Sequence, residues 1–416
     1  MATMLVRGGM PLIGKIAVSG AKNAVLPLLA ASLMATDGKT RLESVPELND
    51  VTTMLEVIRH LGGHINYIDD EIEIDCQNLN GNDAPYNLIS QMRASVLIMG
   101  PLLGRLGKAK VSLPGGCAIG TRPIDLHLKG FGLLGADIVV GHGFVEATAE
   151  RLIGNTIYLD YPSVGATENI MMAACFADGV SIIQNAAEEP EIVDLACFIN
   201  CMGGRVDGAG TDTIVITGRS AFRAPYYRVI PDRIEAGTYM MAAAITAGDL
   251  VVENVIPEHV VSVIAKLREI GVAIEVLGDS VRVIGSGNIL PVDVKTLPYP
   301  GFPTDMQPQM MALLCRGQGT SMITETVFEN RFMHVPELRR MGAHIRTEGR
   351  NAIIKGVTNL SGAPVAASDL RAGAALILAG LAAQGVTEIS GVTHIERGYA
   401  DIVRKLQEVG ADICKK

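Results

Sequence analysis

The hydrophobic pattern of this 416-residue chain repeats six times. In each unit, apolar residues three or four positions apart indicate an amphipathic helix, as in residues 124–134 and 260–267. Each of these helix patterns ends at a glycine, and a short apolar strand pattern follows. The six glycines, which are 73, 68, 68, 71 and 68 residues apart, are Gly62, Gly135, Gly203, Gly271, Gly342 and Gly410. Because glycine readily adopts the left-handed conformation that ends a helix, we expect all six at helix C′ positions.

A second helix pattern in every unit is apolar on all sides, as in residues 171–177 and 239–245. Helices of this kind are buried all round. The six predicted helices cover residues 23–34, 91–103, 167–176, 235–247, 306–315 and 371–383. Short β-branched segments, such as 214–217 and 281–284, predict strands between the helices. We therefore expect the order helix-strand-helix-strand-strand in each unit, with apolar helices inside and sheets outside.

The six units, each about 70 residues long, predict an α/β fold with two domains of three units each. The break between the domains is expected near residues 225–231. One domain then consists of residues 22–229, which include Cys117. The other consists of residues 1–21 plus 230–416.

Composition adds a large core and excludes several partners. The apolar fraction is 48% and the mean hydropathy is +0.31, but no apolar run reaches the ~18 residues that a membrane span needs. The net charge is −9 with no basic run, so we expect no nucleic-acid partner. The N-terminus lacks a signal pattern. Seven irregularly spaced cysteines argue against disulfides, which favours the reducing cytoplasm.

Residues 113–127 hold the chain's most suggestive chemistry. Cys117 lies among glycines, and Arg122 and Pro123 follow it where a helix is expected to start. A thiol beside an arginine at a helix N-terminus suggests chemistry on an anion. A surface loop with an incidental cysteine is an equally good interpretation of this segment by itself.

Cations recur where the predicted helices start. Buried helices begin near Lys22, Arg93, Arg233 and Arg371, and amphipathic helices begin near Arg122, Arg331 and Arg397. A cation there opposes the helix dipole by ~0.3–1 kcal/mol, and a shared bound anion would explain the whole set. Solvated or salt-bridged structural arginines are the alternative for any single residue. Asp305 starts the fifth buried helix, where a capping role is favoured over that of a general base.

The remaining candidate residues point to no metal or cofactor. Cys197 and Cys201 share a helix face, but no His or Asp cluster completes a metal site. The cysteines other than Cys117 are interpreted as core residues. His127 either contacts a ligand or is solvated or capping. No phosphate-binding loop or dinucleotide fingerprint is present, so we expect no cofactor.

Eight motifs together resemble one enzyme family, the UDP-N-acetylglucosamine 1-carboxyvinyltransferases. They occupy residues 19–24, 113–127, 163–167, 231–235, 300–305, 328–334, 369–372 and 396–399, and the resemblance extends over essentially the whole chain. The family fold implied is two inside-out α/β barrel domains with the active site between them. The implied reaction moves the enolpyruvyl group of phosphoenolpyruvate to the 3′-hydroxyl of UDP-N-acetylglucosamine and releases phosphate. That is the first committed step of peptidoglycan synthesis, a cytoplasmic step and the target of fosfomycin. The oligomeric state stays open.

The resemblance also implies roles for individual residues. Cys117 would be the acid toward the enolpyruvyl methylene and could form a covalent adduct, Asp305 would be the base toward the sugar hydroxyl, and Lys22 would be the third catalytic residue. Contacts to phosphoenolpyruvate are implied for Lys22, Asn23, Arg122 and Arg397, and at its carboxylate for Arg331 and Arg371. Contacts to the nucleotide sugar are implied for Asn23, Arg93, Arg122, Pro123, Ile124, Asp125, Leu126, His127, Ser163, Val164, Gly165, Asp305, Val327 and Phe328.

One residue departs from the family pattern, because many members carry lysine where this chain has Tyr161. Two other functions stay in view. The acceptor could be shikimate 3-phosphate, whose transferase shares the fold, although the Cys117 segment argues against it. The chain could also bind nucleotide sugar without turnover, although Lys22, Cys117, Asp305 and Arg397 are all present.

Overall fold

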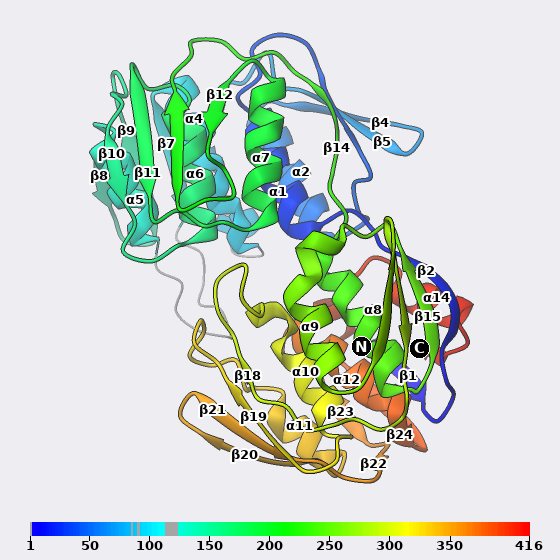
Figure 1. Cartoon of the computed structure of the whole chain (residues 1–416). Coiled ribbons are helices and arrows are strands. Elements are labelled where there is room, and N and C mark those ends of the chain that lie inside the picture. Colours follow the sequence, from blue (N-terminus) through cyan, green and yellow to red (C-terminus); the bar gives the residue numbers. More distant parts are fainter. Residues whose placement is uncertain (1, 85, 90–91, 113–123) are drawn as a thin grey trace. The chain divides into compact units, whose positions relative to one another are not determined.

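The computed structural model describes residues 2–84, 86–89, 92–112 and 124–416, which form two compact units. Unit 1 contains residues 2–19 and 231–416, and unit 2 contains residues 20–112 and 124–230. In each unit the long apolar helices lie inside and the sheets cover them (Figure 1). The predicted α/β fold with helices inside is confirmed.

Unit 2 contains the first three repeats. Its elements are α1 (Lys22–Ser32), β3 (Thr40–Glu43), α2 (Asn49–His60), β4 (His64–Ile68), β5 (Glu71–Asp75), β6 (Asp83–Ala84), α3 (Tyr86–Ile89), η1 (Arg93–Ile98), α4 (Met99–Leu106), β7 (Lys108–Ser112), α5 (Asp125–Leu133), β8 (Asp137–Val140), β9 (Phe144–Thr148), β10 (Thr156–Tyr158), α6 (Val164–Ala174), β11 (Val180–Gln184), α7 (Pro190–Cys201), β12 (Arg205–Asp207), β13 (Thr213–Thr217) and β14 (Tyr226–Arg228).

Unit 1 contains the other three repeats and the N-terminal strands. Its elements are β1 (Met4–Arg7), β2 (Ile13–Ala17), α8 (Arg233–Ile245), β15 (Asp249–Glu253), η2 (Pro257–Val260), α9 (Val261–Glu269), β16 (Ala273–Leu277), β17 (Ser280–Ile284), β18 (Val294–Lys295), η3 (Thr304–Met306), α10 (Gln307–Leu314), β19 (Thr320–Thr324), α11 (Val335–Arg340), β20 (His344–Glu348), β21 (Asn351–Lys355), β22 (Leu360–Ser361), β23 (Pro364–Ala366), α12 (Leu370–Ala382), β24 (Ala383–Gln384), β25 (Val386–Ser390), α13 (Val392–Ile395), α14 (Ile402–Glu408) and β26 (Asp412–Lys415).

Within the described residues, six four-stranded sheets share one topology. Their strand orders are β14-β3-β5-β4, β6-β7-β9-β8, β10-β11-β13-β12, β2-β15-β17-β16, β18-β19-β21-β20 and β23-β25-β1-β26. The first pair in each order is parallel and the other two pairs are antiparallel. The predicted order of elements omitted the short parallel strand, because two to five residues at a sheet edge carry little periodic signal.

Strands from distant parts of the chain close both units. In unit 2, β14 at the end pairs with β3 at the beginning, with Tyr227 opposite Leu42. In unit 1, β2 pairs in parallel with β15, and β1 lies between β25 and β26. Backbone bonds between Thr3 and Lys416 hold the two ends of the chain together (Figure 1). The N-terminal strands therefore complete sheets whose other strands lie more than 200 residues away.

The six repeat glycines have the predicted conformation. Their φ angles lie between 91° and 97°, and a strand begins two residues after each one. In the third repeat, the amide of Gly203 donates to the carbonyl of Asn200 and that of Gly204 donates to Ile199, both at 3.0 Å. The same pair of bonds closes the other five helices. They satisfy the carbonyls at the helix end, and they turn the chain into the strand.

We expect the substitution Gly203→Ala to lower the free energy of unfolding by about 1 kcal/mol, because an alanine at φ +92° is strained although no atom lies within 4 Å of its Cβ. Gly132, which is exposed in α5 of the same unit, also has open space around a Cβ. Gly132→Ala should instead raise stability by about 0.5–1 kcal/mol. Urea unfolding of both variants checks the pair, and equal shifts would contradict the conformational explanation.

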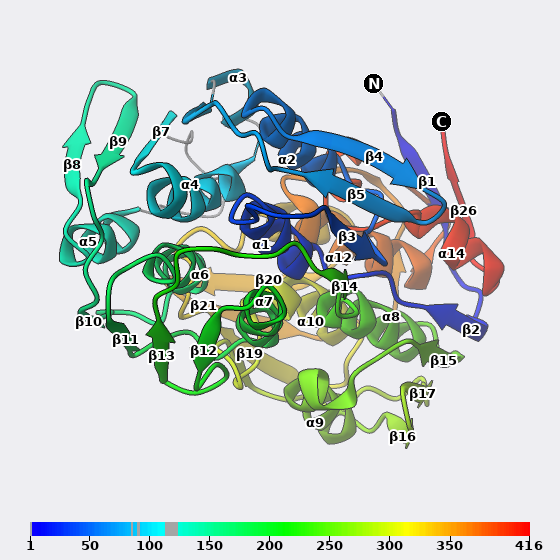
Figure 2. The same cartoon turned by 90° about the horizontal axis from the view of Figure 1, so that it is seen from above.

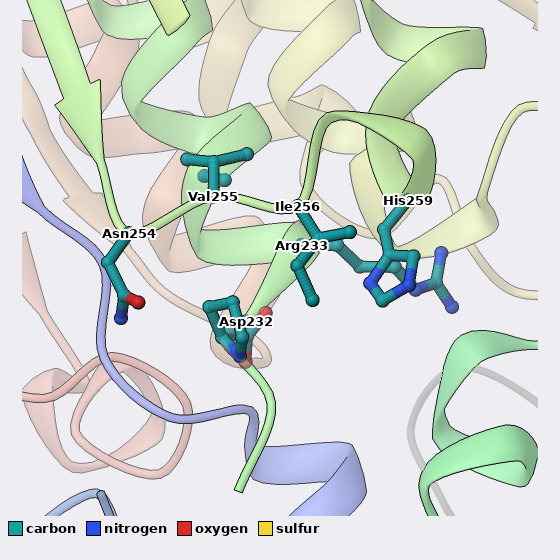
Figure 3. Close-up of a pocket in the computed structure, with 8 residues that line it drawn as sticks. Asp232, Arg233, Asn254, Val255, Ile256 and His259 are labelled. Carbon is teal, nitrogen blue, oxygen red and sulfur yellow. The ribbon is translucent and has the colours of Figure 1, made fainter. Parts of the chain in front are cut away.

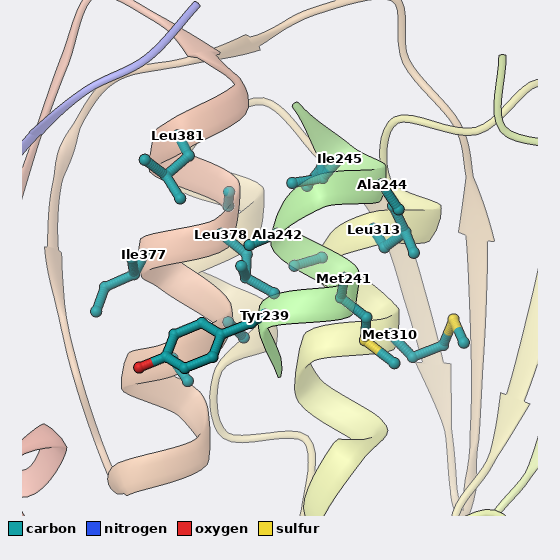
Figure 4. Close-up of a cluster of buried hydrophobic side chains, with 14 of the residues drawn as sticks. Tyr239, Met241, Ala242, Ala244, Ile245, Met310, Leu313, Ile377, Leu378 and Leu381 are labelled. Atoms are coloured by element: carbon teal, nitrogen blue, oxygen red, sulfur yellow. The ribbon is translucent and has the colours of Figure 1, made fainter. Parts of the chain in front are cut away.

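Three inner helices form the centre of unit 1. Residues of α8, α10 and α12 pack against one another, among them Met241, Met310 and Leu378 (Figure 4). In unit 2, α1, α4 and α6 are enclosed by their sheets (Figure 2). A Cβ on Gly100 of α4 would lie 2.2 Å from the carbonyl oxygen of Asn169 on α6, so this glycine permits the close approach of the two helices. The apolar helices are buried as predicted.

Candidate functional site

Asp305 lies between two arginines in unit 1. Its Oδ1 accepts a hydrogen bond from Arg331 Nη2 at 2.9 Å, and its Oδ2 accepts two from Arg371, at 3.2 Å from Nε and 3.0 Å from Nη2. The cap positions of η3 and α10 are Pro303 and Met306, so the prediction that Asp305 caps a helix was wrong. Hydrogen bonds from a guanidinium to a carboxylate are about twice as strong as those between neutral groups. The Asp305 carboxylate therefore bonds to the arginines and not to the backbone amides of the helix.

The two guanidinium groups are buried and retain unused donors. Arg331 is 3% exposed and Arg371 is 1% exposed, whereas the side chain of Asp305 is 26% exposed. Arg331 Nε and Arg371 Nη1 have no hydrogen-bond partner among the residues that the structure describes. Burial opposes the charge of Arg371, but neighbouring Tyr399 and Asp305 raise its pKa above the usual value. Two buried cations with free donors are suited to bind an anion.

Tyr399, between α13 and α14, and the polar groups around it hold Arg371 in place. Its guanidinium lies 5.3 Å from the ring centre of Tyr399, which is 2% exposed. The Tyr399 hydroxyl is 3.0 Å from Thr238 Oγ1 and accepts a hydrogen bond from Gln309 Nε2 at 3.0 Å. At the start of α12, Asp369 caps the amides of Arg371 and Ala372. Thr238 on α8 and Gln309 on α10 therefore hold the tyrosine that lies beside the guanidinium of Arg371 on α12.

Lys22 is the corresponding buried cation of unit 2. It is the first residue of α1, which has no side-chain cap, and its Nζ lies 2.7 Å from Asp50 Oδ2. The two side chains are 9% and 6% exposed. The neighbouring Asn23 is exposed. The prediction of a cation at this helix start is confirmed, and the ion pair with Asp50 was not predicted.

Two segments of the predicted sugar site meet in unit 2. His127 is 7% exposed, and its Nδ1 lies 3.0 Å from Asn169 Nδ2. A Cβ on Gly165 would lie 3.4 Å from His127 Cε1, so the histidine ring packs on the first turn of α6. Ser163 caps this turn through the amide of Ala166. The structure therefore brings residues 124–127 together with residues 163–165.

The other predicted residues lie at helix starts, in turns or after a strand, and three lie outside the described part of the chain. Ile124 is the cap residue of α5, Asp125 is exposed at its start, and Leu126 is half-buried. Tyr161 is 43% exposed. Val164 starts α6, and Val327 and Phe328 lie after β19. Arg331 and Arg397 lie in turns, four and five residues before α11 and α14 begin. Arg93 begins η1, and Cys117, Arg122 and Pro123 lie outside the described residues.

The other cysteines are only partly core residues. Cys76, Cys175 and Cys315 are buried, and burial raises the pKa of Cys76 and of Cys315 to about 12. Cys197, Cys201 and Cys414 are exposed, so the interpretation as core was wrong for them. No group of three or more metal-ligand side chains in the described part of the chain could hold a metal ion. No helix among the residues placed by the structure is long and apolar enough to cross a membrane.

A small depression at the start of α8 is lined by Arg233, one of the helix-start cations, and by none of the residues that the family resemblance implies. Asp232, Arg233, Asn254 and His259 surround it (Figure 3). Its empty volume is about 150 Å³. Sites for small molecules usually measure about 300–1,000 Å³, so this depression is too small for a nucleotide sugar.

Several residues that support the site are not predicted from the sequence. Asp50 contacts Lys22, and Asn169 contacts His127. Glu325 bonds to the amides of Val327 and Phe328, and Tyr399 lies beside Arg371. None of them carries a local signal, since an isolated acid, amide or tyrosine is common in any helix or strand end. Among these four, only Tyr399 belongs to one of the family motifs, at 396–399.

The sequence profile of the EPSP synthase (3-phosphoshikimate 1-carboxyvinyltransferase) family matches residues 6–406. The UDP-N-acetylglucosamine 1-carboxyvinyltransferase 1 of Caldanaerobacter subterraneus subsp. tengcongensis is 59% identical over 98% of this chain and 97% of its own length. The UDP-N-acetylglucosamine 1-carboxyvinyltransferase 2 of Carboxydothermus hydrogenoformans is 57% identical over 99% of both chains.

Solved structures have the same fold. The enolpyruvyl transferase NikO from Streptomyces tendae superposes with a TM-score of 0.90 at 27% identity, over 100% of this chain and 99% of that one. EPSP synthase from Acinetobacter baumannii superposes with a TM-score of 0.75 at 19% identity, over the full length of both chains. The second similarity concerns the fold alone.

Proposed function

The chain belongs to the EPSP synthase family of enolpyruvyl transferases, and from this premise we propose that it transfers the enolpyruvyl group of phosphoenolpyruvate to the 3′-hydroxyl of UDP-N-acetylglucosamine, releasing phosphate. This reaction is the first committed step of peptidoglycan synthesis. The observation that carries the proposal is the identity of 57–59% to two relatives of that name over nearly the whole chain. A cytoplasmic location is supported by the cysteines of the described residues, all six of which are free thiols.

The arginine pair suits the carboxylate of phosphoenolpyruvate. Arg331 and Arg371 keep one donor each beyond their bonds to Asp305, and planar guanidinium groups bind carboxylates through paired bonds. Asp305, the only one of the three that is substantially exposed, then faces the sugar hydroxyl as its base. A paired bond to either guanidinium also needs its Nη2, which Asp305 holds without ligand, so an arriving carboxylate competes with Asp305. Binding of phosphoenolpyruvate would loosen Asp305 and leave its oxygens available for the hydroxyl proton.

The remaining steps concern the proton and the phosphate. The hydroxyl oxygen adds to the enol carbon while the neighbouring methylene gains a proton. Cys117 is suited to donate this proton. Phosphate then leaves and the methyl group loses a proton, which restores the double bond. Lys22, Arg122 and Arg397 are proposed to hold the phosphate, whose charge needs fixed cations. Lys22 is already buried and paired with Asp50, which orients its ammonium group.

The nucleotide sugar is proposed to bind along the segments that meet at His127. Ile124, Asp125, Leu126, His127, Ser163, Val164 and Gly165 belong to these segments. Further contacts are proposed for Asn23, Arg93, Arg122, Pro123, Asp305, Val327 and Phe328. The packing of His127 on Gly165 and its bond to Asn169 support a preformed surface for this ligand.

The test is phosphate release from phosphoenolpyruvate with two acceptors, UDP-N-acetylglucosamine and shikimate 3-phosphate. We expect release with the nucleotide sugar and none above background with shikimate 3-phosphate. Release with shikimate 3-phosphate alone would show that the acceptor is wrong. Tight sugar binding in calorimetry without any product would instead support a binding protein that does not turn over.

A further inference from the structure

Glu325, directly after β19, is a buried carboxylate that accepts four hydrogen bonds. Glu325 is only 1% exposed. Oε1 accepts from Thr296 Oγ1 at 2.8 Å and from the amides of Val327 at 2.8 Å and Phe328 at 3.2 Å. Oε2 accepts from Thr304 Oγ1 at 2.9 Å. All four donors are neutral, and no cation in the described part of the chain forms an ion pair with this carboxylate.

Three of the four donors come from two segments of the proposed site, and the fourth, Thr296, lies outside it. Thr304 begins η3, and the next residue along the chain is Asp305. Val327 and Phe328 begin the loop that leads to Arg331, whose guanidinium lies 5.8 Å from the Phe328 ring centre. One carboxylate therefore ties the turn that carries Asp305 to the loop that carries Arg331. Asp305 and Arg331, which these two segments carry, are bonded to each other.

We propose that Glu325 is a positioning residue, which sets the orientation of Asp305 through Thr304 and that of the 327–328 loop through its amides. The assignment rests on the proposed function of Asp305. A buried acid that bonds only to neutral donors fixes geometry without neutralising a nearby cation, because each acceptor oxygen dictates where its donors lie. The bond to Thr304 is the link that reaches the base, and the bond to Thr296 leads away from it.

Thr304→Val and Thr296→Val form a matched pair that separates positioning from simple stability. Both remove one hydroxyl donor to Glu325 at nearly the same distance. Thr296 Oγ1 also accepts from the amide of Thr326 at 3.0 Å, so Thr296→Val loses one more bond. We expect Thr304→Val to lower kcat about tenfold and to raise the KM for UDP-N-acetylglucosamine, since small displacements of a catalytic group cost much rate. Thr296→Val should lower the Tm more and change kcat less than about twofold.

Glu325→Gln provides the conservative rescue. Its amide oxygen can keep the three bonds of Oε1, and its NH2 group can donate to Thr304 Oγ1. We expect this variant to retain kcat within a few-fold of the parent, whereas Glu325→Ala loses both kcat and Tm. Equal kinetics for Thr304→Val and the parent would overturn the proposal.

Crystal structures of Thr304→Val and Thr296→Val make the test independent of the activity. In Thr304→Val, the distances from Asp305 to Arg331 and Arg371 should exceed hydrogen-bond length, and in Thr296→Val they should match the parent. An unmoved Asp305 in Thr304→Val would overturn the positioning role even if the parent proved inactive toward the nucleotide sugar. Loss of the proposed function would appear separately, as absence of phosphate release by the parent.

Discussion

The substitution Asp305→Asn is expected to lower kcat by about 10²–10⁴-fold, because an amide cannot accept the proton of the sugar hydroxyl. The KM for phosphoenolpyruvate should fall or stay unchanged. Asp305 occupies both Arg331 and Arg371 in the ligand-free chain, so removing its charge leaves two buried cations more attractive to the substrate carboxylate. Steady-state phosphate release at varied phosphoenolpyruvate measures both quantities.

A second acid of unit 1 supplies the control for Asp305. Asp249 accepts two hydrogen bonds from Arg282, at 2.9 and 2.8 Å, and it lies on β15 with its side chain 38% exposed. Asp249→Asn therefore removes a carboxylate paired with arginine outside the proposed site, and kcat should not change. If Asp305→Asn keeps the parent kcat, Asp305 is not the base. If it raises the KM for phosphoenolpyruvate strongly, the competition between Asp305 and the substrate carboxylate is wrong.

The substitution Cys117→Ser is expected to reduce turnover by about 10²–10⁴-fold and to abolish covalent labelling by the epoxide fosfomycin. A thiol begins near pKa 8.5 and can form a nucleophilic thiolate, whereas a serine hydroxyl neither ionises at neutral pH nor attacks an epoxide readily. Labelling is read by intact-protein mass spectrometry, and turnover by phosphate release. The two readouts also separate the roles of the thiol, since an acid serves turnover and a nucleophile serves labelling.

Cys197→Ser is the matched control for Cys117. Cys197 is an exposed free thiol on α7, so it is accessible to the epoxide without belonging to the proposed site. This variant should keep the turnover and the labelling of the parent. Labelling that persists in Cys117→Ser and disappears in Cys197→Ser would remove Cys117 from the reaction.

Because of the competition at the arginine pair, binding of phosphoenolpyruvate affects how Asp305 acts on the other substrate. A carboxylate bonded to two buried guanidinium groups offers few free lone pairs to a hydroxyl. In the proposed reaction, phosphoenolpyruvate is then both a substrate and the group that frees the base. The orientation that Glu325 gives to Asp305 determines where the freed carboxylate lies.

The sequence by itself determined the repeat architecture, because its signals are local. A left-handed glycine at the end of a helix is fixed by backbone sterics, and all six predicted glycines have φ between 91° and 97°. Helices that are apolar on every side have no solvated face, so their burial follows from composition alone, as in α8 and α12. The family motifs are equally local, and they are enough to predict Asp305, Arg331 and Arg371 as site residues.

Only the tertiary structure decided which side chains meet. Asp305 is 26 residues from Arg331 and 66 from Arg371, so no local rule can weigh these ion pairs against a helix cap. The same holds for β14, which pairs with β3, and for Glu325, which joins Thr304 to Val327. Local periodicity fixes what each segment becomes. The partner of a buried charge depends on which segments packing brings within hydrogen-bond distance, and that is a property of the whole chain.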